Sequence, residues 1–357
     1  MITSIAIDGF KSFLAFELDL APVTVLTGPS GAGKTNLLDA VALVAQTMRQ
    51  GFDAATAANP RLSPALLFHR IDDTPSETLT VRLRLTATAD GLPLPLVLQL
   101  TAERTASGGA RINSGLSTIS VAEDAAHPLA QALPPTPLDG TDRTGSRLHD
   151  LARDVLQAFG NDAPADSDQA IADAFRALGR AHHPLLLWDL AALAGAPGVR
   201  ITPAGQLEIN QDHVGWLPYT VLPASIRTAI GQLTAAASGR AVFADNLGEG
   251  LSPDQCAKFL ARLRNRLNDA RPGSESPRQL LATSNAVAVV AALGGPATGE
   301  LVMATKATRV GGGLPAASVT GMRPVREATL QEEHTSTVSG RALRRYLAPA
   351  ALTVDTW

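Results

Sequence analysis

The sequence is poor in cysteine and in aromatic residues, and it has no long apolar run. Its 357 residues include a single cysteine, Cys256, which excludes an internal disulfide and a cysteine-based zinc cluster. Aromatic residues make up 4% of the chain, so Ala, Leu, Val and Thr carry the apolar content. No apolar stretch reaches the roughly 18 residues of a membrane-spanning helix, and the N-terminus lacks the basic and apolar regions of a signal peptide. These absences predict a soluble, cytoplasmic protein with no membrane partner.

A large excess of charge is missing as well. The formal net charge is −3, so no global basic field favours nucleic acid as a partner. Arg262, Arg264, Arg266 and Arg271 fall on or near one predicted helix. We expect a solvated basic face there, and a local patch for nucleic acid or a protein partner is the alternative.

The most informative segment, VTVLTGPSGAGKTNLLDA, occupies positions 23–40. A β-branched run from Val23 to Thr27 leads into a glycine-rich loop, and an apolar helical pattern follows from Leu37. Residues 28–35 match G-x-x-x-x-G-K-[ST] in the strand–loop–helix setting that a phosphate loop requires. The chain is therefore predicted to bind a nucleotide.

The residue types of this loop suit the binding of phosphates. Glycines let successive backbone N–H groups point at a phosphate chain, and the positive end of the following helix adds to the attraction. Lys34 is expected to contact the β- and γ-phosphates, and the Thr35 hydroxyl is expected to ligate Mg²⁺. The residues predicted to bind the nucleotide are Gly28, Ser30, Gly31, Ala32, Gly33, Lys34, Thr35 and Asn36.

A phosphate loop also needs an acidic partner, usually an aspartate at the end of a neighbouring apolar strand. The predicted strand 240–244 is followed directly by Asp245. We expect this aspartate to hold Mg²⁺ through water. An ordinary strand-end aspartate is the alternative, because apolar strands often end in this residue.

Hydrophobic patterning divides the chain into three parts. Residues 1–126 form a predicted N-terminal lobe with the phosphate loop and antiparallel strands, 127–200 a Pro-rich linker and acidic helical insertion, and 201–357 a C-terminal lobe. Residues 51–64 are predicted to form a loop. The alternation of strand and helix after residue 222 favours a mainly parallel sheet. Strands are predicted at 2–8, 13–19, 23–27, 79–88, 94–102, 115–122, 240–244, 279–283 and 299–308, two short strands within 199–210, and helices at 34–50, 147–159, 166–181, 223–237, 254–270 and 286–293.

Four motifs give the chain a resemblance to a known family. IAIDGFKSF at 5–13, the phosphate loop, FADNLGEGLSP at 243–253 and LLATSN at 280–285 occur in this order. They resemble the SMC/RecF/OLD-type branch of the ABC ATPases, over roughly residues 1–50 and 220–310. The resemblance implies an α/β fold: a P-loop NTPase built as an ABC ATPase head, with a mixed sheet, an antiparallel β lobe and a helical insertion.

The resemblance also implies cofactors, partners and residue roles. ATP and Mg²⁺ would bind, with Thr35 and Asp245 as the metal ligands. In this family two heads pair head to tail and enclose two ATP molecules. The implied partner is a second copy of the chain in a homodimer, or an effector subunit in a hetero-complex. Residues 250–253 match the loop that faces the second head.

Three elements depart from the family's catalytic pattern. Asn246 stands where the family has a glutamate that polarises the attacking water, and Asn285 stands where it has a histidine that senses the γ-phosphate. These two asparagines are the candidate catalytic residues. The signature loop would be LPAS at 222–225, in place of the family's Leu-Ser-x-Gly. Gln99 is the candidate for the glutamine of the family's Q-loop.

These departures predict weak catalysis. An amide can orient water but cannot accept its proton, and the loss of a general base typically lowers a rate by 10²–10⁴-fold. We therefore expect the chain alone to bind ATP and to hydrolyse it slowly. Two alternatives stay open: Glu249 substitutes as the base, or a partner subunit supplies the missing groups.

The sequence thus favours an ATP-binding switch whose heads associate when ATP is bound and so control a partner, in DNA repair or phage defence. One alternative is an active, DNA-linked ATPase of the RecF or SMC type, which DNA would stimulate. Another is a structural subunit that retains ATP without hydrolysing it and without a change in association. The process follows from the resemblance alone.

Overall fold

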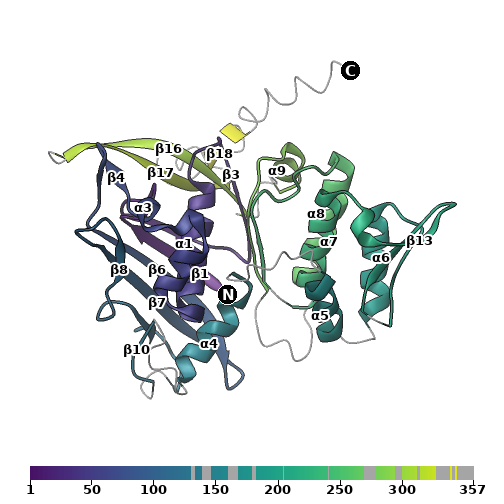
Figure 1. Cartoon of the computed structure of the whole chain (residues 1–357), viewed down its shortest axis with the longest axis horizontal. Helices are drawn as coiled ribbons and strands as arrows, with labels where there is room; N and C mark the ends of the chain where they lie inside the picture. The colour runs from purple at the N-terminus through teal and green to yellow at the C-terminus, as the bar shows by residue number, and fades with distance from the viewer. Residues whose placement is uncertain are drawn as a thin grey trace.

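The computed structural model shows two large sheets with helices packed on both (Figure 1). Among the described residues, no helix is both long enough and apolar enough to cross a bilayer. The structure describes residues 1–129, 133–138, 146–159, 168–178, 182–203, 205–239, 241–268, 278–293, 300–311, 314–326, 338–339 and 342–343.

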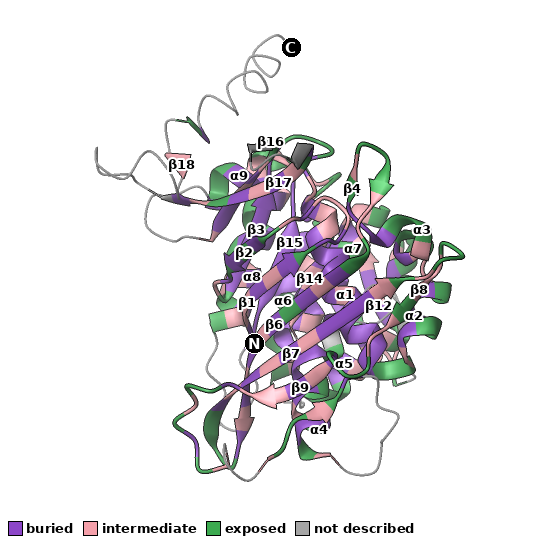
Figure 2. Cartoon of the chain, turned by 90° about the vertical axis from the view of Figure 1, so that its left-hand side faces the viewer, coloured by how far each residue is buried: buried purple, intermediate pink, exposed green. Residues whose placement is uncertain are grey.

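The first sheet is antiparallel and has seven strands in the order β10-β9-β7-β6-β1-β2, with β8 paired to β7. Every second side chain over most of β6 and β7 is buried, as period-two alternation predicts, and buried positions alternate mainly with intermediate ones (Figure 2). The antiparallel meander expected from the sequence is confirmed, and the two N-terminal strands extend the same sheet. The strands are β1 (Ile2–Asp8), β2 (Phe16–Asp19), β6 (Thr78–Ala89), β7 (Leu92–Arg104), β8 (Ala110–Ile112), β9 (Thr118–Val121) and β10 (Thr136–Pro137).

The second sheet has six strands in the order β14-β15-β3-β16-β17-β18. The first four are parallel to one another, and β17 returns antiparallel to β16, so the sheet is mixed. All five residues of β3 are buried, as expected for a central parallel strand covered on both faces. Its strands are β3 (Val23–Thr27), β14 (Val242–Ala244), β15 (Leu280–Thr283), β16 (Leu301–Gly311), β17 (Leu314–Arg326) and β18 (Val338–Ser339).

The second sheet separates two clusters of buried apolar side chains, because neighbouring residues of a strand point to opposite faces. Leu26 and Leu281 belong to the cluster that contains the first sheet and α1. Val25 and Leu280 belong to the cluster that contains α7, α8 and α9. The helix that begins at the phosphate loop is therefore packed in the core between the two sheets. These helices are α1 (Lys34–Gln50), α7 (Ala224–Ala237), α8 (Pro253–Asn268) and α9 (Val287–Leu293).

The helices of 127–200 do not form a separate unit. Side chains of α4 (Arg147–Leu156) join the core of the first sheet. Side chains of α5 (Asp168–Leu178) and α6 (His183–Ala194) join the core of the second sheet instead. The sequence did not predict α6, since its PLLLW segment is apolar on every side.

A small antiparallel sheet follows α6 in the order β11-β12-β13. The two strands expected within 199–210 are β11 (Gly198–Ile201) and β12 (Leu207–Gln211), and β13 (Gly215–Pro218) was not predicted.

The expectation of a loop at 51–64 is wrong. This segment forms α2 (Phe52–Ala58), the short 3₁₀ helix η1 (Pro60–Leu62) and the start of α3 (Pro64–Leu67), before the hairpin β4 (Arg70–Ile71) and β5 (Thr74–Pro75). Phe52 and Leu62 are buried in the core beside α1. Burial of these side chains outweighs the turn-forming residues around them.

Candidate nucleotide-binding site

The phosphate loop connects the buried strand β3 to α1, as the sequence predicts. Gly28 has φ +133°, and a Cβ atom there would lie 2.2 Å from the carbonyl oxygen of Ala304 in β16. Gly33 has φ +91°, and its Cβ would lie 2.1 Å from the Thr320 hydroxyl oxygen of β17. Both positions therefore require glycine for conformational and for steric reasons. Strands β16 and β17 thus pack closely against the loop.

Lys34 lies at the centre of this loop. Its Nζ donates hydrogen bonds to the carbonyl oxygens of Gly28, at 2.7 Å, and of Pro29, at 3.0 Å. Burial lowers the pKa of Lys34, and the charge of Asp245 offsets part of this effect. The ammonium group is thus held over the loop, where it can meet a phosphate chain.

Thr35 and Asp245, the two predicted metal ligands, lie together. The Thr35 hydroxyl donates to Asp245 Oδ1 at 3.2 Å, although 210 positions separate the residues. The contact arises because β14 and β3 end at the same edge of the second sheet, with β15 between them. Thr283, at the end of β15, donates to the same carboxylate oxygen at 2.5 Å. A hydroxyl and a carboxylate are the hard oxygen ligands that Mg²⁺ prefers, so the residues present fit this ion.

The other predicted nucleotide-binding residues follow the loop. Ser30 and Gly31 are exposed, and Ala32 is buried. Asn36 points toward the segment between β1 and β2, where its amide donates to the Ser12 hydroxyl at 2.9 Å. The hydrogen bond to Ser12 thus links the start of α1 to the segment between β1 and β2.

Arg61 is a member of this site that the sequence did not indicate. Its guanidinium is 3.4 Å from Asp245 Oδ2, 3.5 Å from the Thr35 carbonyl oxygen and 2.8 Å from Asp39 Oδ1. Burial acts against the charge of Arg61, but the bonds to Asp39 and Asp245 outweigh it and raise the pKa of the guanidinium. Lys11 reaches Asp39 from the other side, at 2.5 Å. No motif marks Arg61, since it lies in the segment mistaken for a loop.

The two candidate catalytic asparagines are exposed near the same edge of the second sheet. Asn246 directly follows Asp245, and its backbone N–H donates to the Thr283 hydroxyl at 2.9 Å. Asn285 follows β15. Among the described residues, neither amide side chain has a hydrogen-bond partner. Asn246 also has φ +60°, a left-handed conformation in which asparagine is enriched, so the residue suits the backbone at this turn.

The candidate signature loop lies beside the loop of residues 245–251. Pro223 precedes α7, and the next residues of the helix face this loop. A Cβ atom on Gly250 would lie 3.0 Å from the Cβ of Ser225. The candidate signature loop and the segment 250–253, which is predicted to face a second head, are therefore neighbours within one chain.

Two further expectations are wrong. Gln99 lies in β7 with its side chain on the face opposite the buried leucines, where it accepts from Arg82 at 2.7 Å. It is not at the phosphate loop, because α1 packs on the buried face of this sheet. The three arginines of α8 do not form a solvated basic face either, and Arg271 lies outside the described residues. Instead, Arg262 and Arg266 pair with the buried Asp189, and Arg264 pairs with Glu300.

Two comparisons with known proteins match parts of this chain in sequence. The family model described as "AAA domain, putative AbiEii toxin, Type IV TA system" matches residues 23–81. The DNA replication and repair protein RecF of Mesorhizobium japonicum (strain LMG 29417 / CECT 9101 / MAFF 303099) is 36% identical over 73 residues, which cover 17% of this chain. The match spans 19% of the length of that relative.

Solved structures match nearly the whole fold. The SMC head bound to the C-winged helix domain of ScpA has a TM-score of 0.56 at 12% identity, over 90% of this chain and 97% of that chain. The SMC head domain from Thermotoga maritima has a TM-score of 0.51 at 15% identity, over 91% and 99%. The chain therefore has the fold of an SMC head domain, with a phosphate loop at residues 28–35 inside the segment that the AAA family model matches.

Proposed function

We propose that the chain is an ATP-binding switch: bound MgATP drives association with a second ATPase head, and this association controls a partner. The approach of Thr35 to Asp245, at 3.2 Å, carries the proposal, because it joins two Mg²⁺ ligands beside Lys34. Mg²⁺ typically takes its other ligands from water and from the phosphates of the nucleotide. The ion would neutralise part of the negative charge of the β- and γ-phosphates.

Hydrolysis by this switch is slow. Asn246 occupies the position after the metal-binding Asp245, and its amide cannot accept a proton from water. Asn285 at the end of β15 can donate a hydrogen bond to a phosphate oxygen but adds no charge. We expect a turnover number well below the roughly 1–10³ s⁻¹ of ordinary enzymes.

The surface for association consists of the start of α7 and residues 249–253. Both segments are largely exposed, and they lie side by side next to Asp245. The homodimer is the simplest partner, and an effector subunit is the alternative. A solved head of this fold is bound to the C-winged helix domain of ScpA, which supports a partner subunit for this chain as well.

Three proteins test the proposal: the wild type, Lys34→Ala and Asn246→Glu. We expect the wild type to bind MgATP and to double in mass by light scattering when it does, whereas Lys34→Ala stays at its starting mass. Asn246→Glu should gain phosphate release. The proposal is contradicted if the wild type binds no MgATP. It is also contradicted if the wild type binds MgATP but its mass by light scattering stays the same. Tightly retained nucleotide without a change in mass would indicate the structural subunit instead.

The likeness to RecF favours a second candidate, an ATPase that acts on DNA, and it makes DNA repair the process that we propose over phage defence. The observation is the 36% identity over 73 residues to a DNA replication and repair protein. Duplex DNA should then stimulate phosphate release several-fold at low salt and less at high salt. A turnover that is unchanged by DNA excludes this candidate.

A further inference from the structure

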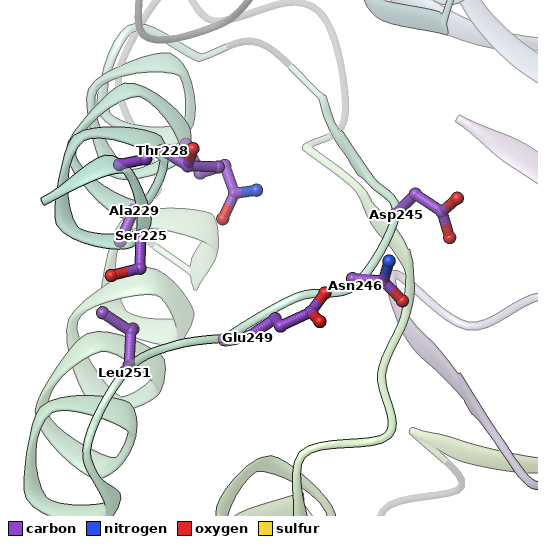
Figure 3. Close-up of a pocket in the computed structure, with 10 residues that line it drawn as sticks. Ser225, Thr228, Ala229, Asp245, Asn246, Glu249 and Leu251 are labelled. Atoms are coloured by element: carbon purple, nitrogen blue, oxygen red, sulfur yellow. The ribbon is translucent and has the colours of Figure 1, made fainter.

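A pocket of about 260 Å³ lies between the start of α7 and the loop of residues 245–251 (Figure 3). Gln232 of α7 is 6% exposed and lines this pocket. Its amide has no hydrogen-bond partner among the described residues. A pocket of this size with polar walls can hold several ordered waters. The polar side chains that line it are Ser225, Thr228, Gln232, Asp245, Asn246 and Glu249.

The backbone brings Glu249 back to Asn246. The N–H of Glu249 donates to the carbonyl oxygen of Asn246 at 3.1 Å, and this hydrogen bond closes a turn whose ends lie within about 7 Å. Gly248 makes the turn with φ +76°, where a Cβ atom would lie 2.6 Å from Val289 Cγ2. The offset of three between the two residues is thus bridged by a fixed turn, and Figure 3 shows the Glu249 carboxylate pointing toward Asn246.

The Glu249 carboxylate is also available to accept a proton. Asp245 already accepts from the hydroxyls of Thr35 and Thr283 and faces Arg61. Among the described residues, Glu249 has neither a hydrogen bond nor an ion pair through its side chain. An ionised carboxylate offers only acceptor sites, so Glu249 can take a proton that Asn246 cannot.

We propose that Glu249 is the proton acceptor for slow ATP hydrolysis in this chain, with Asn246 orienting the attacking water. The inference rests on the proposed function. The water oxygen forms a bond to the γ-phosphorus, and the bond from this phosphorus to the β–γ bridging oxygen breaks. ADP leaves with the electron pair, and one water proton passes to the Glu249 carboxylate. Water in the pocket then returns this proton to solvent, so that ATP and water give ADP, phosphate and H⁺.

The test follows phosphate release with enzyme in excess over MgATP, together with MgATP affinity, for Glu249→Gln. We expect the rate to fall by about 10²-fold or more, while the affinity changes by less than about 2-fold. The matched control is Glu17→Gln, which removes an exposed carboxylate from β2 in the first sheet and should leave both quantities unchanged. The double variant Asn246→Glu/Glu249→Gln should release phosphate faster than Glu249→Gln, because it restores an acceptor.

An unchanged rate in Glu249→Gln overturns the proposal. So does a parallel loss of rate and affinity that Asn246→Glu fails to rescue, since that pattern marks a structural role. A wild-type rate equal to that of Lys34→Ala also overturns it, but it leaves the switch intact if MgATP still binds and drives association. Failure of the wild type to bind MgATP would contradict the proposed function itself.

Discussion

Replacing Asp39 with asparagine tests the charge cluster beneath the candidate metal site. Asp39 is buried on α1, and its carboxylate lies between Lys11, at 2.5 Å, and Arg61, at 2.8 Å. The side chains of Lys11 and Asp39 are 9% and 8% exposed, whereas that of Arg61 is 49% exposed. Asparagine keeps the size of the side chain but removes its charge. The ammonium of Lys11 is then buried without a counter-ion, while Arg61 can turn toward solvent.

The loss is large because a buried charge is left unpaired. Removing one partner of a buried ion pair typically lowers the free energy of unfolding by about 3–5 kcal/mol. Neutralisation of Lys11 sets a ceiling: at about 1.36 kcal/mol per pKa unit, giving up the proton at pH 7 from an ordinary pKa of 10.5 costs about 5 kcal/mol. We therefore expect Asp39→Asn to lose about 3–5 kcal/mol at pH 7.

The pH dependence has a defined sign. Burial lowers the pKa of Lys11 in the folded chain, and Asp39 offsets part of this effect. Below the unfolded-state pKa the unfolded chain binds more protons, so this lysine makes the free energy of unfolding rise with pH. In Asp39→Asn the offset is gone and the pKa falls further. The deficit relative to the wild type should therefore shrink between pH 7 and pH 9.

Urea unfolding at both pH values measures these quantities. Lys11→Met combined with Asp39→Ala should recover most of the loss, because an apolar pair avoids the unpaired charge. Asp254→Asn, which breaks an exposed pair with Lys258, should change stability by less than about 1 kcal/mol. A loss below about 1 kcal/mol in Asp39→Asn, or a deficit that grows with pH, would refute the reasoning.

Three further predictions concern Gly28 and Arg61 of the site and Cys256 in the core. Gly28→Ala should lower the free energy of unfolding by at least about 2 kcal/mol in thermal or urea unfolding and abolish MgATP binding. The reason is that the new Cβ meets the Ala304 carbonyl and that φ at this position is strained for alanine. A stable variant that binds normally would contradict this. Arg61→Ala should change stability by less than about 1 kcal/mol yet weaken MgATP binding by about 10-fold in calorimetry, the effect of one lost charge-assisted bond near Asp245. Burial raises the pKa of the Cys256 thiol, so a thiol reagent at pH 7.5 should label the native chain at least about 100-fold more slowly than the unfolded chain.

Most elements of the fold could be predicted from local patterns in the sequence. The phosphate loop is read from eight consecutive residues because its strand, its turn and its helix start are all determined by neighbours in sequence. The strands of the first sheet are equally visible, since β6 and β7 alternate buried and half-exposed residues. In contrast, α2 and α6 were missed. Their helical state depends on burial against α1 and α8, which periodicity in a short segment does not reveal.

The members of the site that sequence reasoning missed are those that long-range packing brings in. Arg61 reaches Asp245 across 184 positions, and Thr283 reaches it across 38. The aspartate itself could be predicted, since an apolar strand leads directly into it. The partners of Asp245 could not be predicted, because the sequence around Arg61 does not indicate that η1 lies near the edge of the second sheet.

The same distinction explains how binding and catalysis can separate in this chain. The binding residues are integral to the fold: the glycines of the loop press against β16 and β17, and Lys34 is bonded to backbone carbonyls. The amides of Asn246 and Asn285 are exposed and have no hydrogen-bond partner within the described residues. A change at either position should therefore leave the packing in place, and under the proposed function it would alter the chemistry. Under the proposed function, asparagine in place of a general base at position 246 is compatible with a fully formed nucleotide site. Asn246→Glu should cost only the roughly 1–2 kcal/mol of a left-handed backbone that asparagine tolerates better.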